Sequence, residues 1–228
     1  PKLNLKIVKD HPYRLNLLDT PGHADFSEDT YRALAAADNC VLLVDAAKGI
    51  EDRTRKLFEV CRLRKLPVFT FCNKMDRESR DVYEIIDEIQ DNLAIDVTPV
   101  SWPIGAGQDF IGCYDLINDS LELIDKANRN HAVESIKING LEDPELQKHV
   151  PDKLLTKLVE EVEMVRSLLP KIDKKSILEG HLTPIWFGSA INSFGVKELM
   201  KGLGDLAPEP QIQKASPREI LPEERSVT

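Results

Sequence analysis

Short apolar runs alternate with helical periodicity through the first hundred residues of the chain. Residues 39–45 and 68–72 are largely apolar, which is typical of strands buried on both faces of a parallel sheet. Helical spacing follows each run: residues 57–66 predict a helix that Pro67 ends, and a second helix follows the second run. The apolar positions of that second helix are Val82, Ile85, Ile86, Ile89 and Leu93. This strand–helix–strand–helix order predicts an α/β fold with a doubly wound, mainly parallel sheet.

Two further segments precede these elements. Residues 3–9 and 14–18 alternate polar and apolar side chains on either side of a turn that contains Asp and Pro, a pattern that predicts a β-hairpin. A run rich in Ala, Leu, Glu and Arg predicts a helix from about Ser27 to residue 37. Ligands of such sheets bind outside the carboxyl ends of the strands. We therefore expect the turns at residues 19–22 and 73–76 to lie at those ends.

The pattern changes between residues 97 and 182. Short strand-like pieces, separated by Gly, Asn and Asp, occupy residues 97–102, 110–117, 121–124 and 133–138. A helix with apolar positions from Leu154 to Val165 follows, and then a shorter helix over residues 176–179. We interpret this stretch as an inserted α+β subdomain.

The pattern of the first part returns after residue 182, with a strand over 184–187 and a last helix over 196–206. The tail contains four of the fourteen prolines and many charged residues, a composition typical of a linker. The predicted division is therefore a core made of two parts, an inserted subdomain and a linker to a further domain. Their bounds are 1–96 and 183–206 for the core, 97–182 for the insertion and 207–228 for the linker.

Charge and cysteine content exclude several classes of protein. The formal net charge is −9, which argues against direct sequence-specific binding of nucleic acid, because such binding needs a basic surface. Arg62, Arg64 and Lys65 could form a small basic patch for a partner, although a solvated helix surface is the favoured interpretation of these residues. No apolar run approaches the ~20 residues of a membrane helix, and no secretory signal is visible, so we expect no membrane partner. We expect the four cysteines, Cys40, Cys61, Cys72 and Cys113, to be reduced thiols in the core of a cytoplasmic protein.

The turn Asp19-Thr20-Pro21-Gly22 follows a predicted strand. Gly22 has no Cβ, so its backbone N–H can approach a terminal phosphate closely. Asp19 could hold Mg²⁺ through a water molecule, because Mg²⁺ gives up its hydration reluctantly. An ordinary Pro-Gly turn explains the same residues equally well, so this turn by itself leaves phosphate binding undecided.

The turn Asn73-Lys74-Met75-Asp76 follows the next apolar run. A carboxylate at Asp76 can accept hydrogen bonds from the two N–H donors on the edge of guanine, and such paired bonds reject bases that lack them. Lys74 can lay its aliphatic stem along the plane of the base while its ammonium group stays in water. Asn73 would connect this turn to its neighbours. The alternative is a polar turn at the end of a strand.

Two weaker signals gain meaning from their order in the chain. Gly188-Ser189-Ala190 follows the next core strand, where a backbone N–H could face the guanine carbonyl. His23 directly follows Gly22, and its imidazole can act as donor or acceptor, so it could orient an attacking water. A surface histidine in a loop is the alternative for His23.

The motifs DTPGH, NKMDR and GSA together resemble those of translational GTPases. A closer likeness is to the bacterial peptide-chain release factor three family rather than to elongation factor G. It rests on three segments: DFSEDTYRAL (25–34), DAAKGIEDRTRKLFEVCRLR (45–64) and SWPIG (101–105).

This resemblance implies a P-loop-NTPase-like fold that binds GTP or GDP with Mg²⁺. It also implies a cytoplasmic GTP hydrolase of translation termination, with the ribosome and the codon-reading release factors that it recycles as partners. Asp19 would hold Mg²⁺ through water, and His23 would be the catalytic residue that positions the attacking water. The implied GTP-binding set is Asp19, Thr20, Pro21, Gly22, His23, Asn73, Lys74, Met75, Asp76, Ser189 and Ala190.

One departure from the family pattern is severe. No GxxxxGK[ST] motif occurs among the 228 residues, and the switch threonine that ligates Mg²⁺ in the family is missing too. Because the P-loop supplies the phosphate cradle, we expect an N-terminally truncated fragment that is inactive by itself. Two other interpretations stay open. One is a translocation GTPase like elongation factor G, and the other is an interaction module that keeps the fold without binding nucleotide.

Overall fold

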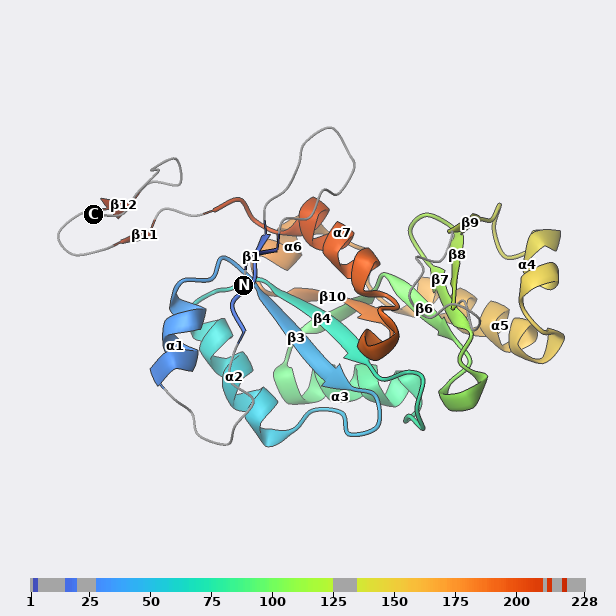
Figure 1. Cartoon of the computed structure of the whole chain (residues 1–228), viewed down its shortest axis with the longest axis horizontal. Coiled ribbons are helices and arrows are strands. Elements are labelled where there is room, and N and C mark those ends of the chain that lie inside the picture. Colours follow the sequence, from blue (N-terminus) through green and yellow to red (C-terminus); the bar gives the residue numbers. More distant parts are fainter. Residues whose placement is uncertain are drawn as a thin grey trace.

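A parallel sheet of four strands forms the centre of the molecule (Figure 1). The computed structural model describes residues 2–3, 15–19, 28–124, 135–210, 213–214 and 219–220. The strand order is β3-β4-β10-β5, and all three pairings are parallel. The strands are β3 (Cys40–Asp45), β4 (Val68–Asn73), β10 (Leu182–Phe187) and β5 (Asp96–Pro99). The predicted α/β fold with a parallel sheet is confirmed.

Helices cover both faces of this sheet, because its central strands are apolar on both sides. Figure 1 shows α2 (Asp52–Leu63) and α3 (Val82–Leu93) on one side, with α6 (Lys174–Leu178) and α7 (Val196–Leu206) on the other. Cys72 of β4 belongs to the same buried cluster as the apolar side chains of α2 and α3. Phe69 and Phe71, which point the other way, cluster with Trp186 and with side chains of α6 and α7. Helix α1 (Glu28–Ala35) lies against α2.

Strand β3 differs from the prediction that it is buried on both faces. It ends the described sheet, and the Leu43 side chain is 62% exposed. By contrast, every residue of β10 is buried. A continuously apolar run predicts a strand in either case, but only the strand order shows which strand lies at an edge.

The ends of two helices follow their local signals. Asp81 caps α3, since its side chain accepts a hydrogen bond from Tyr83 N at 2.9 Å, and Ala94 ends the helix in the left-handed conformation. Helix α2 stops at Leu63 rather than at the predicted residue 66. The reason is that Lys65 adopts a positive φ of 55°.

The inserted region folds around a second, antiparallel sheet of four strands. Its strands are β6 (Ser101–Ile104), β7 (Gly112–Asp115), β8 (Ser120–Leu123) and β9 (Ile136–Lys137). A 3₁₀ turn, η1 (Gly107–Asp109), joins β6 to β7. Helices α4 (Pro144–His149) and α5 (Asp152–Leu168) complete this part, which Figure 1 shows beside the core. Helix α4 was not predicted, although Asp143 before Pro144 is a helix-start signal.

The single strand predicted over residues 97–102, at the start of the insertion, is wrong. Residues 97–102 are not one strand of the insertion but parts of two strands in different sheets. Strand β5 pairs with β10 of the core, from Asp96 opposite Leu182 to Pro99 opposite Ile185. Val100 is the point of change, because its N–H donates to Ile185 while its carbonyl accepts from Leu116 of the insertion. The predicted domain bounds stay predictions.

Short pairs of strands lie near both ends of the chain. β1 (Lys2–Leu3) pairs antiparallel with β2 (Leu15–Asn16), in keeping with the predicted hairpin. β11 (Gln213–Lys214) and β12 (Glu219–Ile220) pair in the region predicted as a linker. The pair β1–β2 is a separate sheet. Contrary to our expectation, the strand before Asp19 does not belong to the described core sheet, since β2 pairs with β1 alone among the described strands.

Two exclusions concern the described part of the chain. None of its helices is long and apolar enough to cross a bilayer. All four cysteines are free thiols, three of them buried and Cys40 half-buried, which agrees with the expectation of reduced core cysteines.

Candidate functional site

The ends of three parallel strands meet at one edge of the core sheet. Asp45, the last residue of β3, lies opposite Asn73, the last residue of β4. Phe187, at the end of β10, lies opposite Cys72. The loops that follow β4 and β10 therefore start side by side, and these loops contain the predicted residues 73–76 and 188–190.

Asn73 connects these two loops through its side chain. Its Oδ1 accepts hydrogen bonds from the backbone N–H of Lys74 at 2.8 Å and from that of Ala190 at 2.9 Å. A backbone bond of 3.1 Å from Met75 N to Gly188 O adds a second link between the loops. The two loops are thus joined independently of any ligand.

The turn at residues 188–190 differs from the sequence-based expectation. All three of its backbone N–H groups already donate within the protein: Gly188 to Cys72 O, Ser189 to Phe194 O and Ala190 to Asn73 Oδ1. The expected N–H for a guanine carbonyl is therefore not left free at these residues. Ala190 uses its N–H to hold the side chain of Asn73, and the predicted contact of Ser189 and Ala190 with guanine stays a prediction. Ser189 is fully buried, and its Oγ accepts from Asn192 in the 3₁₀ turn η2 (Ala190–Asn192).

Gly188 is the residue of this turn that packing makes irreplaceable. A Cβ atom placed on it would lie 2.4 Å from Phe194 O and 2.8 Å from the ring of Phe71. Neither the backbone oxygen nor the buried ring can move away easily, so any side chain here would displace the turn from β4 and from Phe194.

Asp76 carries a buried oxygen atom that has no hydrogen-bond partner in the described part of the chain. Its Oδ1 is one of two buried side-chain polar atoms, with Ser79 Oγ, that make no hydrogen bond within the described residues. Buried acceptors are nearly always paired, and leaving one unpaired costs about 1–3 kcal/mol. One oxygen of this half-buried carboxylate is thus shielded from water and lacks a donor within the described residues, a cost that a donor supplied by a ligand would relieve.

Lys74 has an unusual backbone conformation and an ion pair at the tip of its side chain. Its backbone has a positive φ of 73°, and its Nζ lies 2.6 Å from Asp45 Oδ2. Burial raises the pKa of Asp45, but hydrogen bonds from Lys74 and from the backbone of Ala47 outweigh it and keep that pKa below the usual value. Sequence reasoning missed Asp45, although an aspartate that ends an apolar run is the same signal that marks residue 19.

Met75 belongs to the core rather than to the surface of the loop. Its side chain is fully buried, and its carbonyl accepts from Gly107 N at 2.9 Å, which links the loop to η1. This residue therefore anchors the turn, and the polar residues on either side of it are the ones that remain for a ligand.

The predicted phosphate side of the site is largely outside the described residues. Asp19 is described and exposed, whereas Thr20, Pro21, Gly22 and His23 lie outside. In the described part of the chain, no three His, Cys, Asp or Glu side chains group as metal ligands would. The Mg²⁺ role of Asp19 and the catalytic role of His23 stay predictions.

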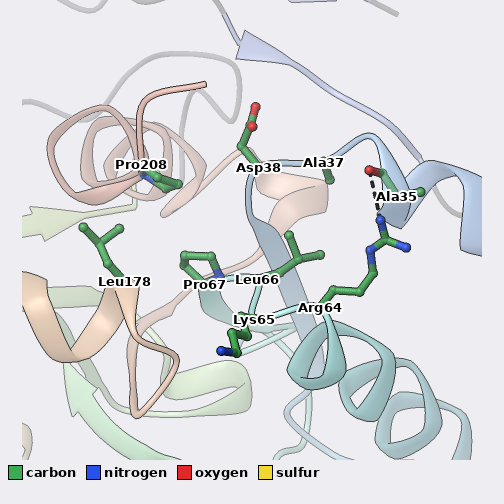
Figure 2. Close-up of a pocket in the computed structure, with 9 residues that line it drawn as sticks. All are labelled: Ala35, Ala37, Asp38, Arg64, Lys65, Leu66, Pro67, Leu178 and Pro208. Carbon is green, nitrogen blue, oxygen red and sulfur yellow. Dashed lines mark hydrogen bonds between the residues drawn. The ribbon is translucent and has the colours of Figure 1, made fainter. Parts of the chain in front are cut away.

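A cavity of about 380 Å³ opens at the other end of β3 and β4, next to the residues that precede these strands (Figure 2). None of the predicted nucleotide-binding residues lines it. Arg64 and Lys65 of the predicted basic patch do, and Arg64 donates to Ala35 O at 3.3 Å. Arg62, the third member of the patch, pairs with Glu59 at 2.9 Å. Cations in this place complement the dipole at the end of α2, so the fold itself explains them.

Comparison with known proteins agrees with this architecture. A crystal structure of ttk003000868 from Thermus thermophilus superposes with a TM-score of 0.64 at 22% sequence identity. The match covers 86% of this chain but only 30% of that one. At this identity the likeness shows the fold alone.

The family match extends over nearly the whole chain. The model of the elongation factor Tu GTP binding domain matches residues 3–209, a range that includes the core strands, the insertion and all three predicted motifs. The chain therefore belongs to the elongation factor Tu GTP-binding domain family of translational GTPases.

Proposed function

We propose that this chain is the guanine-binding part of a ribosome-dependent GTPase of translation termination, which recycles codon-reading release factors. Membership of the GTP-binding domain family supports the nucleotide. The release-factor assignment is supported by the likeness of residues 45–64 and 101–105 to the release factor three family. Below, the longer GTPase that contains this chain together with a P-loop is termed the parent GTPase.

The observation that carries guanine binding is the buried Oδ1 of Asp76, which no described residue pairs with. A neutral amide in its place would present a donor as well as an acceptor, whereas a carboxylate only accepts. Two donors side by side, as on guanine, satisfy it, and the adenine edge does not offer them. The site therefore discriminates between bases by leaving its own acceptor unpaired with the wrong one.

Hydrolysis is assigned to residues on the other side of the nucleotide. Asp19 would hold Mg²⁺ through a water molecule, and His23 would orient the water that attacks the γ-phosphate. When bound, Mg²⁺ neutralises charge on the phosphates. No GxxxxGK[ST] motif occurs in these 228 residues, so the phosphate cradle has to come from elsewhere in the parent GTPase.

A second function is favoured by that same missing motif. An interaction module that keeps the GTPase fold without binding nucleotide would need no phosphate cradle. It would, however, leave Asp76 Oδ1 buried and unpaired with no benefit in return, and for this reason we prefer the first proposal.

Exchange of guanine for xanthine in the parent GTPase tests the base-reading role of Asp76. Asp76→Asn should weaken the binding of GTP and strengthen the binding of xanthosine triphosphate, because xanthine offers an acceptor where guanine offers an amine. Competition between the two nucleotides measures the preference. An unchanged preference would remove Asp76 from base recognition. A second measurement separates termination from translocation. If the parent GTPase acts in termination, its ribosome-stimulated GTP hydrolysis should be coupled to the dissociation of a release factor.

A further inference from the structure

Asp45 is fixed in direction by its own turn. Its Oδ1 accepts from the backbone N–H groups of Ala47 at 2.9 Å and Lys48 at 3.3 Å. The next residue, Ala46, donates its N–H to Asn73 O at 2.9 Å, which fastens the turn to β4. The second carboxylate oxygen, Oδ2, is thereby left to face Lys74.

The loop from residue 45 to residue 50 is also fastened to α3. Glu88 Oε1 accepts from Ile50 N at 3.1 Å, and Glu88 Oε2 pairs with the guanidinium of Arg80. Arg80 N in turn donates to Ala46 O at 3.0 Å. Gly49 has a φ of 71°, and a Cβ on it would lie 2.2 Å from Glu88 Oε2. The loop that carries Asp45 is thus held from two sides.

The ion pair with Asp45 fixes Lys74, the long charged side chain of the predicted base-binding turn. Nζ of Lys74 lies 2.6 Å from Asp45 Oδ2, and the two side chains are 44% and 16% exposed. A free lysine loses much rotamer entropy when a ligand orders it. A lysine that is already held loses less, so the binding free energy of the ligand improves.

We propose that Asp45 is a positioning residue for the guanine nucleotide. By holding the ammonium group of Lys74, it keeps the aliphatic part of that side chain ready to cover the plane of the base, next to the carboxylate of Asp76. This inference rests on the proposed function and extends it. Asp45 acts on affinity and not on base preference, because a base plane is common to guanine and xanthine whereas the edge read by Asp76 is not.

Titration calorimetry of the parent GTPase with GDP tests the inference. Asp45→Asn keeps an acceptor for Ala47 N but loses the charge that holds Lys74, so GDP affinity should fall about three- to fivefold, as for a partly exposed ion pair. The affinity of the Asp76→Asn variant for xanthosine diphosphate should fall by the same factor when Asp45→Asn is added. In a Lys74→Met background, which retains the apolar stem, Asp45→Asn should have no further effect.

Asp115 provides a matched control. Its Oδ1 accepts from Ile117 N and Asn118 N in an equivalent turn at the end of β7, and no lysine pairs with it among the described contacts. Asp115→Asn should therefore leave GDP affinity unchanged.

Three outcomes overturn the inference: GDP affinity of Asp45→Asn within about 1.5-fold of wild type, an equal loss in the Lys74→Met background, or wild-type affinity of Lys74→Met itself. The GDP affinity of Lys74→Met tests the inference even if Asp45→Asn fails to fold, because Lys74→Met leaves the turn at Asp45 intact. An Asp76→Asn variant that still prefers GDP to xanthosine diphosphate refutes the proposed function instead. The two failures are therefore distinguishable.

Discussion

Removing the side chain of Asn73 should loosen the connection between the two loops of the site and destabilise the chain. In Asn73→Ala, the N–H groups of Lys74 and Ala190 lose the Oδ1 acceptor that they share at 2.8 and 2.9 Å. The strands beneath are unchanged, so the loss is confined to these two bonds. The backbone bond from Met75 N to Gly188 O remains as the other link between the loops.

The magnitude follows from the two bonds and their surroundings. A net contribution of ~1 kcal/mol per bond gives an upper value of ~2 kcal/mol. Lys74 is half-buried and Ala190 is exposed, so water can replace part of the lost bonding. We therefore expect the free energy of unfolding to fall by about 1–2 kcal/mol. At about 2–4 °C per kcal/mol for a chain of this size, the melting temperature should fall by roughly 2–8 °C.

Urea unfolding of the 228-residue chain, followed by circular dichroism, measures this change directly. Asn118→Ala is the control, because it removes one exposed side-chain bond to Asp115 and should cost less than ~0.5 kcal/mol. The reasoning is refuted if Asn73→Ala is as stable as Asn118→Ala. A changed slope of the transition would mean that the substitution altered more than these two bonds.

Three further predictions concern nucleotide, catalysis and pH. The 228-residue chain should bind GTP weakly or not at all, because it has no GxxxxGK[ST] cradle for the phosphates; submicromolar affinity for a fluorescent GTP analogue with Mg²⁺ would contradict this. In the parent GTPase, His23→Ala should reduce ribosome-stimulated hydrolysis by ~10²–10⁴-fold and change nucleotide binding by less than ~1 kcal/mol; single-turnover hydrolysis within twofold of wild type would remove the catalytic role. Burial raises the pKa of Asp119, but hydrogen bonds from Tyr114 and Arg166 lower it below the usual value. The stability that Asp119 contributes is therefore complete above the pKa of an unfolded aspartate, about 3.9, and is lost as the pH falls through the lower folded value. Arg166→Gln should accordingly flatten the loss of stability in that acidic range, and an unchanged pH profile would show that this contact has no such effect.

Local sequence patterns determined the elements whose signals are complete within a few residues. The spacing of Ile85, Ile86 and Ile89 predicts α3 because one face of a helix repeats every 3.6 residues, and these three side chains are indeed buried. Strands β4 and β10 follow from apolar runs that are long enough for strands and too short for helices. The order of the motifs at residues 73–76 and 188–190 also places them correctly at neighbouring strand ends, since parallel strands present the same ends at one edge.

Tertiary structure alone decided which partners those elements find. The run at residues 97–102 reads as one strand, yet Val100 divides it between two sheets, because the hydrogen bonds that decide come from Ile185 and Leu116. The exposed edge at Leu43, the amide of Ala190 that is engaged by Asn73, and the pairing of Lys74 with Asp45 likewise depend on residues far apart in the chain. Periodicity reports how one segment divides its surface between core and water. It contains no information on which distant donor or acceptor completes a hydrogen bond, and in this protein such bonds give the candidate site its geometry.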